Sequence, residues 1–252
     1  MEDSVLIEWM TSKKLLDGKA IVAAVKDRNL ELVQRLHRGG CPWDKDACYW
    51  AAIHRDLKCL KYLHENGCPW DESTCYIAAA NNSLNCLIYA HEEGCVWNWK
   101  TCREAAAKGY LDCLRYAHEE GCEWDKWTCK AAAAKGRLDC LKYLHEEGCE
   151  WDKWTCKAAA ENGHLDCLVY AHENGCEWGE STCRFAAANG HLDCLRYAHE
   201  HGCEWNIHVY RAAFDHPTCL EYLEKHKCPA TMMMKLDRII SKLTRNDTVL
   251  MY

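Results

Sequence analysis

The sequence predicts an all-α fold, a solenoid of about eight stacked helix pairs. A unit of 27 residues recurs along most of the 252-residue chain, and each unit contains two short helical segments separated by a turn. One such pair cannot bury its own apolar face, whereas stacked neighbours bury a continuous core. We therefore expect a repeat array over residues 17–230, an N-terminal cap over 1–16, and a C-terminal capping helix with a tail over 231–252.

Three series of cysteines define the repeat and together contain all 21 cysteines of the chain. The first series is Cys48, Cys75, Cys102, Cys129, Cys156 and Cys183. The second is Cys59, Cys86, Cys113, Cys140, Cys167, Cys194 and Cys219. The third is Cys41, Cys68, Cys95, Cys122, Cys149, Cys176, Cys203 and Cys228. Because each cysteine has equivalents in other units, none is singled out as a functional residue.

One complete unit, residues 128–154, shows the elements in order. Thr128 is expected to cap a first helix, "CKAAAA" at 129–134, which is rich in the strongest helix former. Gly136 follows because a helix end commonly needs a residue in the left-handed conformation. A second helix over 137–147 has its leucines on one face and ends in glutamates, which predicts a buried side and a solvated back.

The turn residue between the two helices varies among the units. Asn82 takes the place of glycine in one unit and tolerates the left-handed conformation, whereas Arg55 takes it in another and should cost some stability. The end units are degenerate, as expected of caps. Ile21 and Leu32 replace cysteine in the first unit, and Tyr210 replaces it in the last.

Composition and charge exclude several classes of protein. The net charge of −7 argues against a basic nucleic-acid binder. No apolar run approaches the ~18 residues of a membrane span, and the N-terminal stretch lacks the features of a secretory signal. An odd number of cysteines without a signal indicates reduced thiols. We therefore expect an intracellular protein, cytoplasmic or nuclear, that does not bind membranes.

The unit resembles the ankyrin repeat through "AAAKGRLDCLKYLHEEGCEWD" at 132–152. The family has two alanines, then Asn-Gly-His-Leu-Glu, an aliphatic helix and Gly-Ala-Asp-Val-Asn. Two units keep the turn closely, "ENGHLDCL" at 161–168 and "ANGHLDCL" at 188–195. The ankyrin unit has about 33 residues, and the six that are missing here fall where the family builds its β-hairpin finger. We therefore expect no fingers.

The array looks most like the cysteine- and tryptophan-rich ankyrin-like arrays of large DNA viruses and some protists. This resemblance implies a scaffold for protein–protein interaction, with a host protein as the partner and the host cell as the location if the likeness is viral. It is specific for the fold and says little about the partner, because repeat folds serve many partners. No constellation of catalytic residues breaks the period, so we expect no enzyme.

The cysteines and histidines have two structural interpretations. The recurring "HEEGC" is not the HExxH motif of zinc proteases, because its fifth residue is cysteine and Gly121 interrupts the helix. The preferred interpretation makes each cysteine a small buried hydrophobe, with no cofactor. The alternative is structural zinc, because His145, Cys149, Cys156 and Cys167 form a Cys₃His set of tetrahedral ligands.

The periodic tryptophans and histidines are also expected to serve packing. Seven of the 12 tryptophans and seven of the 14 histidines keep the 27-residue period. They are Trp43, Trp70, Trp97, Trp124, Trp151, Trp178 and Trp205, and His37, His64, His91, His118, His145, His172 and His199. We expect the tryptophans to lie in the core and the histidine rings to hydrogen-bond to nearby carbonyls.

The first helices carry the positions that vary most between units, and we expect them to line the concave, partner-binding face. Aromatic and arginine side chains on one face are typical of interface hot spots. The candidates are Tyr49, Trp50, Tyr76, Trp99, Arg103, Trp127, Lys130, Trp154, Lys157, Arg184 and Phe185. The sequence therefore predicts a protein-interaction scaffold, with a zinc-stapled repeat protein as the alternative. Nucleic-acid binding by the basic side chains is a third, less favoured class.

Overall fold

In the computed structural model, the structure describes residues 17–230. These residues form 16 α-helices and no strand, so the predicted all-α fold of eight helix pairs without β-hairpin fingers is confirmed for this part of the chain. The predicted caps at 1–16 and 231–252 lie outside the described residues. Backbone contacts divide the chain into two compact units, Met1–Thr128 and Cys129–Tyr252. The division into array and caps stays a prediction.

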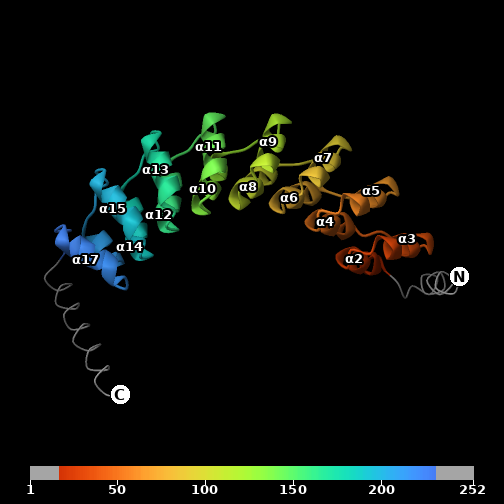
Figure 1. Ribbon diagram of the computed structural model, residues 1–252, viewed down its shortest axis with the longest axis horizontal. Coiled ribbons are helices and arrows are strands. Elements are labelled where there is room, and N and C mark those ends of the chain that lie inside the picture. The colour runs from red at the N-terminus through yellow and green to blue at the C-terminus, as the bar shows by residue number, and fades with distance from the viewer. Residues whose placement is uncertain (1–16, 231–252) are drawn as a thin grey trace, which may run out of the picture. The chain divides into compact units, whose positions relative to one another are not determined.

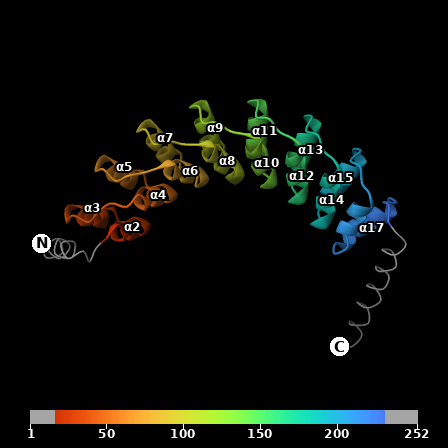
Figure 2. The ribbon, with the colours of Figure 1, turned by 180° about the vertical axis from the view of Figure 1, so that it is seen from behind.

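The first unit contains four helix pairs, and Figure 1 shows their order. Its helices are α2 (Gly18–Lys26), α3 (Leu30–Arg38), α4 (Asp46–Ile53), α5 (Leu57–Glu65), α6 (Glu72–Ala80), α7 (Leu84–Glu92), α8 (Trp99–Lys108) and α9 (Leu111–Glu119). Within this unit α4 packs against α6 and α6 against α8, while α5 contacts α7 and α7 contacts α9. First and second helices thus form two layers, which Figure 2 shows from behind.

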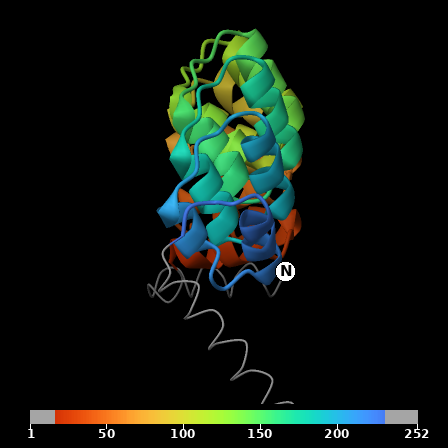
Figure 3. The same ribbon diagram turned by 90° about the vertical axis from the view of Figure 1, so that its left-hand side faces the viewer.

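The second unit repeats the arrangement. Its helices are α10 (Lys126–Ala134), which begins just before the unit boundary, then α11 (Leu138–Glu146), α12 (Lys153–Glu161), α13 (Leu165–Glu173), α14 (Glu180–Ala188), α15 (Leu192–Glu200), α16 (Ile207–Ala212) and α17 (Pro217–Lys225). Here α12 packs against α14 and α14 against α16, while α11 contacts α13 and α13 contacts α15. Figure 3 shows this stack from the end that carries α17.

Small side chains fill the space between the helix layers. The alanines of the first helices, such as Ala132 and Ala133, are fully buried, as are leucines of the second helices, such as Leu141 and Leu144. All 21 cysteines are buried and none forms a disulfide. The prediction that the cysteines occupy core positions, as small buried hydrophobic residues, is therefore confirmed.

The first helices begin earlier than the sequence suggested. Thr128 was the expected N-cap, but α10 starts at Lys126, and the Asp125 carboxylate accepts a hydrogen bond from the Trp127 backbone N–H at 3.0 Å. Thr128 lies inside the helix and is fully buried. Equivalent caps at other first helices are Asp17, Asp71, Asn98, Asp152 and Asn206. The prediction that Thr128 is the N-cap is wrong. The cap is the aspartate or asparagine three residues earlier, whose backbone is extended and whose side chain accepts a hydrogen bond from a free N–H group of the first turn.

The turn between the helices requires a left-handed residue. Gly136 has φ +64°, and a Cβ on it would lie 2.6 Å from the His164 ring of the following repeat. Glycine is thus needed there both for conformation and for close packing. Arg55 adopts φ 58° and Asn82 adopts φ 55°, as the sequence predicted. The strain at Arg55 is partly offset by a hydrogen bond from its Nε to the Asn81 carbonyl at 2.7 Å.

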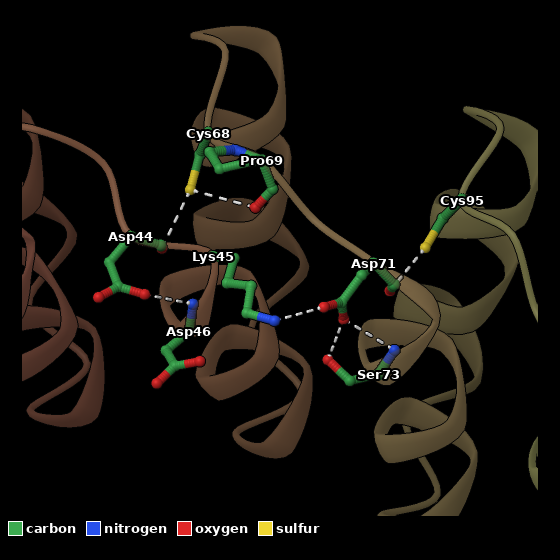
Figure 4. A network of polar contacts seen from close by, with 8 residues as sticks. All are labelled: Asp44, Lys45, Asp46, Cys68, Pro69, Asp71, Ser73 and Cys95. Carbon is green, nitrogen blue, oxygen red and sulfur yellow. Dashed lines mark hydrogen bonds and ion pairs between the residues drawn. The ribbon is translucent and has the colours of Figure 1, made fainter.

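The junctions between repeats are short extended segments that third-series thiols hold in place. In the first unit Cys68 Sγ donates to the Asp44 carbonyl at 3.5 Å, and Cys95 Sγ donates to the Asp71 carbonyl at 3.2 Å (Figure 4). Each bond joins a thiol to the preceding junction, 24 residues earlier in the chain. The missing finger residues are therefore replaced by contacts between the junction backbone and the next repeat.

One junction also carries an ion pair. Lys45 Nζ lies 2.8 Å from Asp71 Oδ2, and the Asp71 carboxylate accepts hydrogen bonds from the Ser73 backbone N–H and hydroxyl (Figure 4). The Lys45 ammonium and then the Ser73 hydroxyl lower the pKa of Asp71. The capping carboxylate of α6 therefore stays charged over a wider pH range than an ordinary aspartate.

Candidate functional site

All the candidate partner-binding residues lie on first helices, as the sequence predicted. Their side chains differ in exposure. Among the described residues, the large hydrophobic side chains that are most exposed are Val96 at 73 %, Trp127 at 45 %, Trp99 at 40 % and Trp154 at 39 %. Three of these four are candidates, and each lies in the first two positions of its helix. The other candidate aromatics are only partly exposed.

In the first unit, cations gather around the Trp99 indole on α8. The Arg103 guanidinium lies over the Trp99 ring, 4.4 Å from its centroid. Lys100 Nζ lies between Trp99 and Tyr76 of the preceding repeat, 5.9 Å from each ring centroid. Arg103 also pairs with Glu104 at 3.6 Å, so its charge is partly compensated. The cluster offers an indole edge surrounded by cationic groups.

A second group in the first unit lies on α4. The rings of Tyr49 and Trp50 meet edge to face with centroids 6.0 Å apart, and Trp50 stacks on His54 at 5.9 Å. Lys26 Nζ of the preceding repeat lies 4.2 Å from the Trp50 ring centroid. Burial, and then the neighbouring Tyr49, raise the pKa of Tyr76.

In the second unit the corresponding group centres on Lys157 of α12. Its ammonium lies 3.8 Å from the Phe185 ring centroid and 5.1 Å from that of Trp154. Lys130 Nζ lies 6.0 Å from the Trp154 ring, and the Arg184 guanidinium lies 5.0 Å from Phe185. Lys157 also forms an ion pair with Glu161 at 3.4 Å, and its side chain is only 15 % exposed. It therefore positions the Phe185 and Trp154 rings as well as presenting a charge at the surface.

The Trp127 side chain is the most exposed of the three indoles, and Lys126 Nζ lies 5.7 Å from its ring. Each of the three exposed tryptophans thus has a lysine or arginine within 6.0 Å of its centroid. The same pattern recurs in both units, although the structure gives no relation between Trp127 and Trp154. The expected solvated back is confirmed at Glu119, Glu120, Glu146 and Glu147, which are all exposed.

The periodic histidines and tryptophans form clusters that sequence reasoning missed. His172 stacks on Trp178 with ring centroids 3.6 Å apart and an interplanar angle of 8°, and both rings meet Tyr197 edge to face. The Tyr197 hydroxyl and His172 Nδ1 are 3.1 Å apart and hydrogen-bonded. Equivalent histidine–tyrosine bonds start at His37, His64, His91 and His199.

This finding corrects two expectations. The periodic tryptophans are half-buried and do not lie in the core, because each indole lies against a histidine ring and keeps part of its surface exposed. In these clusters the histidine Nδ1 bonds to a tyrosine hydroxyl of the next repeat, where a carbonyl was expected. The signal that could have found the clusters is the tyrosine series Tyr62, Tyr89, Tyr116, Tyr143, Tyr170, Tyr197 and Tyr222, most of which are 27 residues apart.

The alternative zinc set is not brought together. Cys149 lies against Cys129, with their sulfur atoms 3.0 Å apart, while Cys156 bonds to the Cys176 carbonyl at 3.7 Å. The His145 ring stacks on Trp151 at 4.0 Å. Within residues 17–230, no group of three or more His, Cys, Asp or Glu side chains is arranged to hold a metal ion. The repeat period is compatible with several pairings of these residues. The structure forms a different pairing from the one that the zinc set requires.

Comparisons with known proteins agree with this architecture. The family model for ankyrin repeats (many copies) matches residues 48–91 in the first unit and 156–199 in the second. Among solved structures, the human ASB11 ankyrin repeat domain is similar, with a TM-score of 0.53 and 16 % identity over 62 % of this chain and 84 % of that chain. At this identity the likeness shows the fold alone. No curated protein matches the chain.

The helix pairs of this protein therefore have an ankyrin-like fold in shortened form. Ankyrin repeats generally mediate protein–protein interaction, and the fold is typically a non-enzymatic binding scaffold. In the described part of the chain, every helix is too short or too polar to cross a membrane.

Proposed function

We propose that the chain is a protein-interaction scaffold that binds a partner protein through the aromatic and basic side chains of its first helices. The observation that carries this proposal is the exposure of Trp99, Trp127 and Trp154, each with a cation beside its ring. Tryptophan side chains are highly buried on average, and tryptophan and arginine are enriched among interface hot spots.

The chemistry of the surface favours a partner segment that is both acidic and apolar. Trp99 is flanked by Arg103 and Lys100, and Trp154 by Lys157 and Lys130. A carboxylate of the partner would pair with these cations while an apolar side chain covers the indole. The whole chain has a net charge of −7, so the basic groups distinguish this face from the exposed glutamates of the second helices.

Two finer points belong to the same proposal. By the resemblance to ankyrin repeats, the first helices line the concave side of the array, and partner binding there is part of what we propose. The likeness to the cysteine- and tryptophan-rich arrays of large DNA viruses and protists supplies a host protein as the partner. Both points are independent of the chemistry of the indoles.

The test compares two variants in parallel affinity purifications followed by mass spectrometry. The face variant combines Trp99→Ala with Trp154→Ala, and the control combines Glu119→Gln with Glu146→Gln on the second helices. Each hot-spot side chain typically contributes ~2 kcal/mol or more to binding, so the face variant should lose its partner and the control should keep it.

Both variants must keep the helical circular dichroism of the parent chain, so that loss of binding reports on the surface. If the partner binds the face variant as tightly as the parent chain, the first-helix surface is not the binding site. A partner that is released from both variants alike contradicts the proposal as well, because the glutamate face would then matter equally. Capture of nucleic acid with a steep salt dependence would replace the scaffold by the third class of function.

A further inference from the structure

The buried cysteines of the structure are arranged as pairs. Cys129 on α10 and Cys149 after α11 have their sulfur atoms 3.0 Å apart, and the Cys129 thiol also points to the Cys149 carbonyl at 3.8 Å. The same thiol-to-carbonyl approach, over a separation of 20 residues, occurs at Cys75, Cys102, Cys156 and Cys183. The pairing therefore belongs to the repeat and is present in both units.

The second-series cysteines are placed differently. Cys140 is buried, and no hydrogen bond joins its sulfur to that of a first- or third-series cysteine. Cys113 Sγ approaches a side-chain amide oxygen, that of Asn82 at 3.9 Å. Each complete repeat thus contains one dithiol pair and one second-series thiol apart from it, and the latter serves as an internal control.

The sulfur–sulfur distance indicates which chemistry the pair suits. A tetrahedral zinc ion with Zn–S bonds of about 2.3 Å holds two sulfurs ~3.8 Å apart, so zinc would push Cys129 and Cys149 away from each other in a filled core. A disulfide needs about 2.04 Å, an approach of roughly 1 Å, which side-chain rotation can supply. The geometry therefore favours bond formation between the sulfurs over metal binding.

We propose that Cys129 and Cys149 are a redox-active dithiol that a peroxide oxidises to a disulfide, and that the equivalent pairs 20 residues apart react in the same way. The Cys149 thiolate attacks one peroxide oxygen, the O–O bond breaks, and water leaves after protonation. The resulting sulfenic acid is attacked by the Cys129 sulfur, which forms the S–S bond and releases the second oxygen as water. Two thiols lose two electrons and two protons, and one peroxide becomes two water molecules.

Two observations assign the first step to the third-series cysteine. Cys149 is 4 % exposed while Cys129 is completely buried, so a small oxidant reaches Cys149 first. In equivalent pairs the first-series thiol donates a hydrogen bond to its partner. This bond lowers the pKa of Cys95, Cys122, Cys176 and Cys203. A stabilised thiolate is the form that reacts with peroxide.

The experiment needs one mass tag, because trypsin releases the same peptide, "WTCK", from 127–130 and from 154–157. The variant Lys130→Arg changes the first of these to a heavier peptide and keeps the cleavage site and the charge. The folded, reduced variant is treated with hydrogen peroxide, the remaining thiols are alkylated, and the tryptic peptides are analysed by mass spectrometry.

We expect the tagged peptide with Cys129 to be linked to "YLHEEGCEWDK" at 143–153, with the loss of two hydrogen atoms. The peptide "LDCLK" at 138–142, which carries Cys140, should be recovered alkylated. A dithiol reductant should restore all the thiols. Linkage of 143–153 to the untagged peptide with Cys156, or to Cys140, would overturn the proposal, as would over-oxidised Cys149 without any linkage.

Two further samples keep the test decisive. Adding Cys149→Ala should abolish the linkage of Cys129, whereas adding Cys140→Ala should leave it unchanged, and both proteins are checked for native helical content. The same oxidation in denaturant should give scrambled linkages. If native and denatured proteins give the same mixture, the fold does not select the pair, and the proposal fails without any need for a variant.

Discussion

Replacing Trp178 by leucine tests whether the histidine–tryptophan–tyrosine clusters hold neighbouring repeats together. The Trp178 ring contacts His172, which precedes it in the chain, and Tyr197 of the next repeat. Leucine keeps part of the apolar contact but removes both ring interactions. The substitution therefore addresses an interface between repeats without creating a cavity in the alanine and cysteine core.

The size of the effect follows from the two ring contacts. The stack on His172 has centroids 3.6 Å apart, and the edge-to-face contact with Tyr197 has them 5.9 Å apart. Each aromatic pair contributes about 0.5–1.5 kcal/mol beyond area burial, so the loss should be ~2 kcal/mol. For a chain of this size 1 kcal/mol corresponds to roughly 2–4 °C, which gives a decrease in Tm of ~4–8 °C.

The assay is urea and thermal unfolding followed by far-ultraviolet circular dichroism, with Trp154→Leu as the matched control. Trp154 undergoes the same chemical change, but its ring is 39 % exposed and lies 5.1 Å from the Lys157 ammonium. An exposed cation–π contact is worth ~0.5–1 kcal/mol, so the control should lose less than half as much stability. Equal losses at both positions, or no loss at Trp178, would refute the assignment of these clusters to inter-repeat packing.

Three other outcomes follow from the structure. Burial lowers the pKa of His172 and His199 in the folded protein, so protonation of these histidines favours the unfolded chain. Their contribution to stability is complete above the ordinary histidine pKa of ~6.5, and it is lost as the pH falls through the lower pKa of the folded state. Thermal unfolding should therefore shift to lower temperature between neutral and mildly acidic pH, and a Tm that rises on acidification would contradict this. Arg55→Gly should raise stability by ~0.5–1 kcal/mol in urea unfolding because it relieves the left-handed strain at φ 58°, and Asn82→Gly should gain less. Since all 21 cysteines are buried, a thiol reagent should label most of them slowly in native protein and rapidly in denaturant, and fast native labelling would show that the core is open.

Much of the fold could be predicted because the same residues recur in every repeat. The alanines and leucines gave the two helices, and a glycine gave the turn, as Gly136 shows with its φ of +64°. The helix starts were misplaced at Thr128 because a buried threonine and a capping threonine look alike in sequence. Only the position of the Asp125 carboxylate beside the Trp127 N–H distinguishes them.

The helices that carry the candidate residues could be predicted from the sequence, but the exposure of their side chains could not. Sequence variation between repeats placed the candidates on first helices, where they are found. It could not tell that Trp99 would stand exposed with Arg103 over its ring, or that Lys157 would be largely covered by Phe185 and Trp154. Exposure depends on the rotamers and neighbours of each side chain, and these come from the adjacent repeat.

By itself the sequence determined the period, the helix pairs, the absence of room for β-hairpin fingers and the core position of the cysteines. Those properties depend on the composition and length of one repeat. Only the tertiary structure decided which periodic residues meet. Cys149 faces Cys129 and not Cys156, and the His172 ring bonds to Tyr197 of the next repeat. In a strictly periodic sequence, several such pairings are equally compatible with the spacing of the residues. The packing of one repeat's backbone against the next determines which of these pairings forms.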